Sequence, residues 1–187
     1  MDRQTVMRAQ QGDRAAFTAI VDAIVDRFVM VAQRILRDRA AAEDATQQAL
    51  LGIWRDLPAL RDPSRFEAWS YRLLVNACYS EARRAHRWLP NLPLEAAPEP
   101  AARDEFSVVV DRDQLERGFR CLPVDQRAVV VLHHYLGLPM TSVAEVLHVP
   151  EGTVRSRLHV AMTKLRSALV EDVPSSGPIH AVQGVVR

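Results

Sequence analysis

Residues 151–166 carry side chains suited to reading a nucleic acid, with four basic residues against a single acidic one. Arginine can donate two hydrogen bonds to the edge of a guanine base, whereas serine and threonine hydroxyls mainly contact phosphates. The candidate contact residues are Thr153, Arg155, Ser156, Arg157, His159 and Lys164. This pattern predicts a helix face that reads duplex DNA. The competing interpretation is an ordinary solvated helix face.

A second basic segment lies at residues 72–88, where four arginines again oppose one acid. Aromatic residues are interleaved with them, namely Tyr71, Tyr79 and Trp88. Unpaired bases stack on aromatic rings while guanidinium groups hold the backbone, so this composition suits a single strand. Aromatic residues at helical spacing are also common in cores, and Trp69 is expected there. The loop at residues 61–65, just upstream, could hold an extruded base.

The sequence offers no site for catalysis, a metal or a cofactor. It contains no paired carboxylates, no nucleophile with a base and no Walker-type loop. Cys78 and Cys121 lack the close spacing of zinc ligands and are expected to be small buried apolar groups. His133 and His134 are adjacent, which on a helix points them about 100° apart rather than at one ion. We therefore expect a protein that is not an enzyme.

Apolar residues at helical spacing predict three helices in the first half, over residues 17–35, 41–57 and 66–87. Pro58 ends the second, and a polar turn at residues 60–65 precedes the third. One stripe of the third helix holds Trp69, Leu73, Asn76, Ala77 and Ser80. These helices would position the single-strand segment.

The second half predicts shorter helices, among them residues 141–147 and a last helix that opens at Pro150, where a first-turn proline is tolerated. The tight turn at residues 148–150 between them is typical of a helix-turn-helix. In that motif the second helix inserts its N-terminal residues into the major groove while its inner face stays packed. The motif thus explains how residues 151–166 would reach DNA.

No convincing strand pattern occurs, so the predicted fold class is all-α, with two small helical modules joined by a flexible linker and a helix-turn-helix in the second. Residues 89–110 are rich in proline and acids and are predicted to form the linker. The modules would span residues 1–88 and 111–172, and residues 173–187 would form a disordered tail.

The chain has 187 residues and a formal net charge of only +1, which taken alone argues against a nucleic-acid partner. This net charge is a sum over unlike parts, because the acidic segment at residues 89–110 lies between two mildly basic modules. No stretch reaches the 18 or more apolar residues of a membrane span, and no signal peptide is evident. We therefore expect a cytoplasmic protein with no direct membrane insertion.

Three segments together resemble the extracytoplasmic function (ECF) class of bacterial RNA polymerase sigma factors. Residues 42–54 (AEDATQQALLGIW) look like the region-two helix that docks on the polymerase clamp. Residues 66–76 (FEAWSYRLLVN) are similar to the helix behind recognition and melting of the minus-ten element. Residues 122–127 (LPVDQR) and 151–158 (EGTVRSRL) resemble region four, which reads the minus-thirty-five element. The resemblance covers about residues 10 to 170 in the family order.

The resemblance implies roles for particular residues. Polymerase docking would use Asp44, Gln47, Gln48 and Leu51, with Leu50, Ile53 and Trp54 supplying area that docking buries. The alternative for the last three residues is that they belong to the core. The minus-ten strand would be held and opened by Arg61, Ser64, Arg65, Asn76, Arg83, Arg84 and Arg87. The implied partners are core RNA polymerase, promoter DNA (duplex at minus-thirty-five, melted at minus-ten) and an anti-sigma factor. Catalysis would belong to the polymerase.

The chain departs from the family pattern at the helix-turn-helix corner, where His148 replaces the usual glycine. Histidine is among the residues tolerated at positive φ, so the turn is expected to survive with some strain. Ser80 stands where the family often has an acid, and Val160 and Met162 stand where it tends toward arginine. A rival hypothesis is a stand-alone helix-turn-helix regulator that binds duplex DNA without polymerase. The basic and aromatic 72–88 segment favours the sigma factor.

Overall fold

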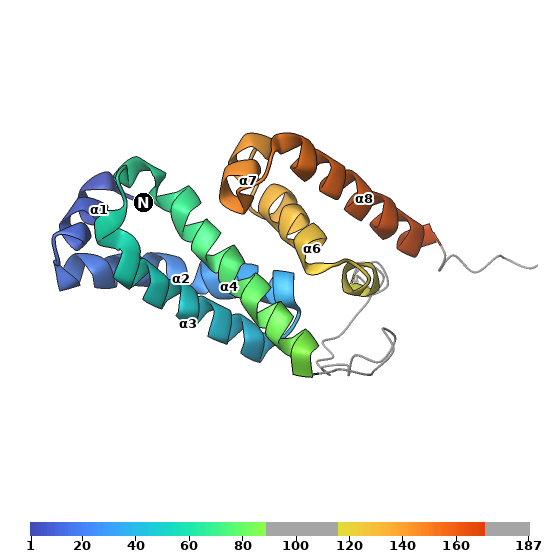
Figure 1. Ribbon diagram of the computed structural model, residues 1–187, viewed down its shortest axis with the longest axis horizontal. Helices are drawn as coiled ribbons and strands as arrows, with labels where there is room; N and C mark the ends of the chain where they lie inside the picture. Colours follow the sequence, from blue (N-terminus) through green and yellow to red (C-terminus); the bar gives the residue numbers. More distant parts are fainter. Residues whose placement is uncertain (89–115, 171–187) are drawn as a thin grey trace, which may run out of the picture.

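The computed structural model describes residues 1–88 and 116–170, and every regular element in these two ranges is helical (Figure 1). Long helices make up most of the first range, and the second range holds shorter helices and one long C-terminal helix. The elements are α1 (Arg3–Gln10), α2 (Arg14–Leu36), α3 (Arg39–Asp56), η1 (Leu57–Ala59), η2 (Pro63–Arg65), α4 (Phe66–Trp88), α6 (Val124–Val130), η3 (Val131–Tyr135), α7 (Met140–Leu147) and α8 (Glu151–Val170). The predicted linker at 89–110 and the tail from 173 lie outside the described residues.

Aspartate side chains begin four of the elements of the first module. Asp13 accepts a hydrogen bond from the Ala16 amide at 3.1 Å, and Asp38 accepts one from the Ala41 amide at 2.8 Å. Asp2 and Asp62 cap α1 and η2 in the same way. Each carboxylate satisfies an amide that has no partner inside the helix and interacts favourably with the helix dipole.

The first module buries one continuous core between α2, α3 and α4. Its largest fully buried side chains are Ile20, Phe28, Ile35, Ile53 and Leu74. Ala42, Ala45 and Ala49 line the buried face of α3, and their small size lets α3 approach α2 and α4 closely. The pattern confirms the amphipathic helices that the sequence predicts.

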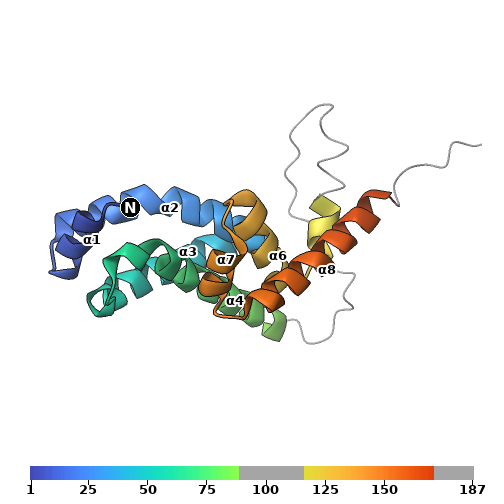
Figure 2. The same cartoon turned by 90° about the horizontal axis from the view of Figure 1, so that it is seen from above.

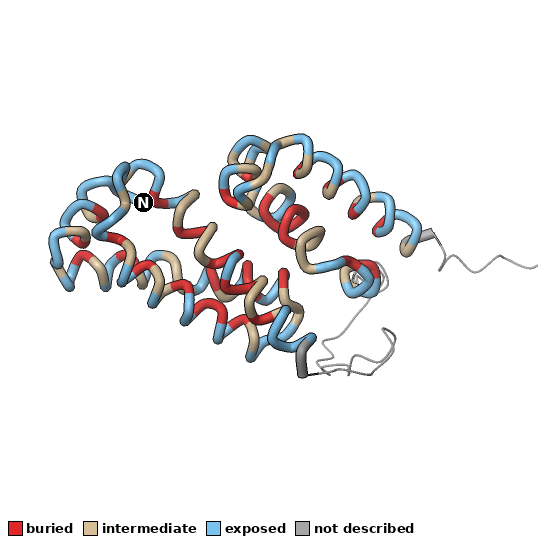
Figure 3. The backbone as a smooth tube through the Cα atoms, viewed as in Figure 1, coloured by how far each residue is buried: buried red, intermediate tan, exposed pale blue. Residues whose placement is uncertain are grey.

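The second module is built around α6 and η3, whose residues 128–132 are buried (Figure 3). Val154 and Ala161 are fully buried on the inner face of α8, against α6 and α7. Between α7 and α8, His148 adopts a left-handed φ of 54°, and the Val149 amide donates to the Ala144 carbonyl at 3.1 Å. The predicted helix-turn-helix, including the strained corner, is therefore confirmed.

The two modules pack against each other in this structure (Figure 2). Helix α7 lies against α4, and α6 contacts both α2 and α4. Figure 1 shows α4 running between α3 on one side and α7 on the other. The loop that precedes α4 is thereby placed beside the helix-turn-helix.

Several details differ from the sequence-based expectations. Cys121 is exposed rather than buried, because it lies in the turn before Pro123 and Leu122 fills the core there instead. Asn76 is exposed and does not share a buried stripe with its neighbours. Helix α4 buries a wider face, centred on Leu74 and Cys78, because it packs on α2, α3 and α7 together. Helix α1 and the π-helical turn η3 are additional elements.

Candidate nucleic-acid interface

The face of α8 that points away from the second module carries the polar side chains predicted to read DNA. Arg155, Ser156, His159 and Lys164 are exposed, whereas Thr153 is half-buried near the start of the helix. The Arg155 guanidinium donates to the Glu151 carboxylate at 2.8 Å, one helical turn earlier. This contact holds the arginine along the outer surface. One side of α8 is thus committed to packing and the other is available to a ligand.

Arg157 has different surroundings from the other predicted contact residues. Its Nε lies 3.3 Å from Oδ2 of Asp125 on α6, and its side chain is only 30% exposed. Both charged groups influence Tyr79 of α4, whose pKa burial raises to about 12. Arg157 therefore lies at the junction of the two modules, where it is only partly available to DNA.

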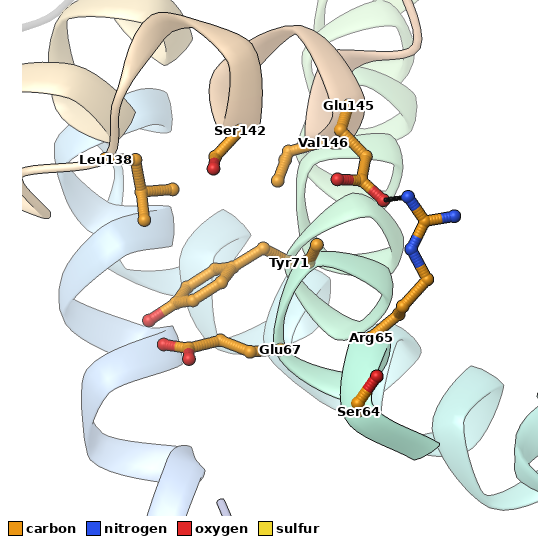
Figure 4. Close-up of a pocket in the computed structure, with 9 residues that line it drawn as sticks. Ser64, Arg65, Glu67, Tyr71, Leu138, Ser142, Glu145 and Val146 are labelled. Carbon is orange, nitrogen blue, oxygen red and sulfur yellow. Dashed lines mark ion pairs between the residues drawn. The ribbon is translucent and has the colours of Figure 1, made fainter. Parts of the chain in front are cut away.

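The loop at residues 61–65 is held by a local hydrogen-bond network. The Asp62 carboxylate accepts from the Ser64 amide at 3.0 Å and from its hydroxyl at 2.7 Å. These hydrogen bonds lower the pKa of Asp62 below its ordinary value, because they favour the ionised form. Arg61 is exposed, and the Arg65 guanidinium lies 2.8 Å from Oε1 of Glu145 on α7 (Figure 4). The loop is thus shaped before any ligand binds.

Along α4 the predicted strand-binding residues line a solvent-facing side. Asn76, Arg83 and Arg84 are exposed, and the Arg84 guanidinium lies 3.8 Å from the buried carboxylate of Glu81. Arg83 donates to the Ser80 hydroxyl at 3.2 Å, so serine at this position keeps a polar partner. The side chain of Arg87 lies outside the described residues. The basic part of the prediction thus maps to one accessible helix face.

Tyr71 does not belong to that accessible face. It is 3% exposed, its ring centroid lies 5.4 Å from that of Phe28, and burial raises its pKa to about 12. Trp69 is half-buried against Phe66. The core interpretation of these aromatics is therefore the better one, and a base could not stack on Tyr71 without unfolding the packing around it.

A third surface lies on α3. Asp44, Gln47, Gln48 and Leu51 are all exposed, as predicted for a docking face, and Leu51 exposes 61% of its surface. Gln48 donates to Oε1 of Glu81 at 2.5 Å, which ties this face to α4.

Trp54 extends the α3 surface, which leaves it accessible to supply area that docking would bury and does not fit the alternative that it belongs wholly to the core. It is 49% exposed, with its ring edge-on to Phe17 at 4.6 Å between centroids. The signal was present in the sequence, because Trp54 lies three and seven positions after Leu51 and Gln47, on the same helix face. Ile53 is fully buried, so it belongs to the core and is not accessible for docking.

Two family models match the chain, one for each module. Sigma-70 region 2 matches residues 20–88, and Sigma-70 region 4 matches residues 112–165. The ECF RNA polymerase sigma factor SigL of Mycobacterium tuberculosis is 31% identical over 172 residues, which cover 88% of this chain and 97% of that protein. The chain belongs to the ECF sigma factors. It is therefore a DNA-binding transcription initiation factor that binds core RNA polymerase and recognises promoter elements.

Further comparisons agree on family and fold. The ECF sigma factor SigW of Bacillus subtilis is 25% identical over 186 residues, covering 90% of this chain and 97% of SigW. Among solved structures, CnrH in complex with the cytosolic domain of CnrY has a TM-score of 0.66 at 24% identity and covers 91% of this sigma factor and 98% of that chain. That similarity shows a shared helical fold.

The two family matches fall on different groups of helices in this ECF sigma factor. The region 2 match takes in most of α2 and all of α3 and α4, and the region 4 match contains α6, α7 and most of α8. Helix α1 precedes the region 2 match. Within the part of the chain that the structure describes, none of the helices is long and apolar enough to cross a membrane.

Proposed function

We propose that α8 reads the minus-thirty-five element of a promoter through its outer face, with Arg155 as the base-reading residue. The observation that carries this proposal is the two-sided character of α8, whose apolar face is buried in a helix-turn-helix while its basic face is exposed. Ser156, His159 and Lys164 would contact the base edges and backbone beside it, with Thr153 at the helix start. Arg157 would join them only where its pairing with Asp125 is released.

We assign the melted minus-ten strand to the loop at residues 61–65 and the exposed side of α4. Guanidinium groups there would hold the strand backbone, and Asn76 and the Ser64 hydroxyl would hydrogen-bond to unpaired bases. The assigned residues are Arg61, Ser64, Arg65, Asn76, Arg83, Arg84 and Arg87. The hydrogen bonds of Asp62 support this assignment, because they shape the loop in advance of binding.

We infer that the α3 surface docks on core RNA polymerase. Asp44, Gln47 and Gln48 supply polar and charged contacts, and Leu51 with Trp54 supplies exposed apolar area. Large exposed hydrophobic side chains beside polar ones are typical of a protein interface. Residues 1–88 and 111–172 would form the two modules, with residues 89–110 connecting them and residues 173–187 as a tail. The chain would work in the cytoplasm and leave catalysis to the polymerase.

We further propose an anti-sigma factor as a partner. Two structural neighbours are described as complexes: CnrH with the cytosolic domain of CnrY, and RpoE with the anti-sigma factor NepR from Bartonella quintana. The second has a TM-score of 0.63 at 22% identity and covers 83% of this chain and 98% of that one.

Transcription with purified core polymerase on a promoter library, followed by sequencing of the transcripts, tests the function. We expect transcripts to start from promoters that share a motif at both elements, and only when the protein is present. Tight duplex binding without polymerase, combined with no initiation in its presence, would overturn the proposal in favour of a stand-alone regulator. The α3 surface and the region 2 match favour the polymerase-dependent function.

A further inference from the structure

The contact between the two modules uses a residue that we assign to the promoter strand. Arg65, in the minus-ten loop, is paired with Glu145 of α7 (Figure 4). A pocket between the modules adjoins this ion pair and is lined from both sides, by Glu67 and Tyr71 from α4 and by Ser142 and Val146 from α7. The helix-turn-helix therefore covers one edge of the loop.

Other contacts support the same arrangement. The Arg34 guanidinium lies 3.8 Å from the centroid of the Tyr135 ring, and the Tyr135 hydroxyl lies 3.7 Å from the sulfur of Met30. Arg37, which ends α2 in a left-handed conformation, is paired with Glu116. These contacts link α2 to the second module at points separate from the Arg65 pair.

A carboxylate on Arg65 occupies the position that a DNA phosphate would need. The planar guanidinium binds carboxylate and phosphate groups through the same fork of N–H donors, so the two ligands compete. The Arg65 side chain remains 64% exposed and that of Glu145 42% exposed, which makes this a weak, salt-screened pair that a strand could displace.

The junction also contains features that oppose it. The Nε atoms of Arg37 and Arg127 and the Tyr79 hydroxyl are buried without a hydrogen-bond partner. Burial lowers the pKa of Arg127, and the neighbouring charge of Arg37 lowers it further. Unsatisfied buried polar groups and adjacent like charges both raise the free energy of the packed arrangement. Weak contacts such as the Arg65–Glu145 pair therefore hold the closed arrangement, and unsatisfied buried polar groups with adjacent like charges oppose it.

We propose that the second module is an intramolecular lid on the minus-ten loop, in which Glu145 takes the place of a DNA phosphate on Arg65. This inference rests on the proposed role of Arg65 in holding the strand. Opening the lid separates α7 from α4, frees Arg65 for DNA and exposes Arg37 and Arg127 to water. The same chain therefore carries both the strand-binding residue and its competitor.

Two single variants test the lid in opposite directions, in the full-length protein without polymerase. Glu145→Gln keeps the shape of the side chain but removes its charge, so we expect a larger radius of gyration in small-angle X-ray scattering. Its affinity for a labelled single strand carrying a selected minus-ten sequence should rise about twofold to fivefold, as expected for loss of one exposed competing ion pair. Arg127→Met removes the buried charge and should make the protein more compact.

Glu43→Gln is the matched control, because Glu43 is also an exposed helix carboxylate paired with an arginine, Arg39 at 2.9 Å, but lies on α3 away from the junction. It should change neither the scattering nor the affinity for the strand. If Glu145→Gln behaves like this control in both measurements, the lid is wrong. Arg65→Ala tests the strand site separately from the lid. If this variant loses affinity for the strand, the strand site is upheld whatever the result for Glu145→Gln.

A charge swap provides a second readout. Arg65→Glu combined with Glu145→Arg restores the ion pair in reverse, so the double variant should be as compact as the natural protein while each single reversal is expanded. Strand binding should stay weak in the double variant, because a carboxylate then faces the DNA at position 65. Recovery of strand binding, or no recovery of compactness, would overturn the lid.

Discussion

Arg155 and Arg157 show how two identical side chains on one helix reach different environments. Two residues span about 200° around a helix, so Arg155 points to solvent while Arg157 points toward α6. Arg155 is held by Glu151 of its own helix, and Arg157 pairs with Asp125 of another. Residue type alone predicts the same role for both arginines; helical spacing separates their directions, and the packing of α6 against α8 supplies the partner that Arg157 meets.

Replacing Arg155 by alanine should relax base discrimination at one position of the minus-thirty-five element. A bidentate contact from arginine to guanine contributes about 1–3 kcal/mol of discrimination, so the preference for the favoured base should fall about fivefold to 150-fold. Selection of promoter variants by holoenzyme reconstituted with Arg155→Ala measures this directly. Weakening that is uniform across all sequences would instead make Arg155 a phosphate contact.

Arg157→Ala is the matched comparison for Arg155→Ala, because it removes the same side chain two positions along the helix. We expect it to leave the base preference unchanged and to lower the melting temperature, since it leaves Asp125 unpaired at the junction. A shifted base preference in this variant would return Arg157 to the DNA-reading surface.

The corner between α7 and α8 shows what a single element requires of one residue. The chain must adopt a positive φ there to join the two helices, and His148 does so at 54° with its side chain exposed. A left-handed conformation costs a residue with a Cβ about 1–2 kcal/mol, whereas glycine adopts it freely. The sequence predicts this turn well, because turn chemistry depends on local residues.

His148→Gly should therefore stabilise the protein, by about 0.5–1 kcal/mol once the greater freedom of glycine in the unfolded chain is subtracted. Urea unfolding of the full-length protein measures the change. Gly137→Ala serves as the reverse control, because Gly137 has a φ of 68° and open space around it, so the backbone alone is strained. A less stable His148→Gly variant would show that the imidazole makes a stabilising contact.

Elements without a strong local signal were harder to predict. Helix α1 buries only Val6 and Ala9, too few apolar positions to reveal a helical period. The burial of Tyr71 depends on Phe28 of another helix, so the sequence around Tyr71 could not distinguish a base platform from core. The long amphipathic helices and the basic outer face of α8 could be predicted because their patterns repeat within one segment.

For the whole molecule, the packing of the modules could not be read from the sequence. Arg65 and Glu145 lie 80 positions apart, and each resembles any other surface charge in its own segment. The structure adds that the proposed docking face is open while one edge of the proposed minus-ten loop is covered. Asp44, Gln47 and Leu51 are exposed on α3, and α4 lies between α3 and α7 (Figure 1). Polymerase can therefore engage the closed molecule before the lid opens.

Asp44→Arg tests whether this face carries the docking. Reversing a charge at an interface places like charges opposite each other at a cost of several kcal/mol, so affinity for core polymerase should fall at least about tenfold. The folded modules should be unaffected, because Asp44 is exposed and forms no part of the core. Anisotropy of the labelled protein titrated with core polymerase measures the affinity, and circular dichroism with thermal melting checks the fold.

Asp22→Arg makes the same change at an exposed site on α2 and should bind normally. An Asp44→Arg variant that binds as tightly as this control would remove Asp44 from the docking surface, and the first contact with polymerase would then have to lie elsewhere on the closed molecule.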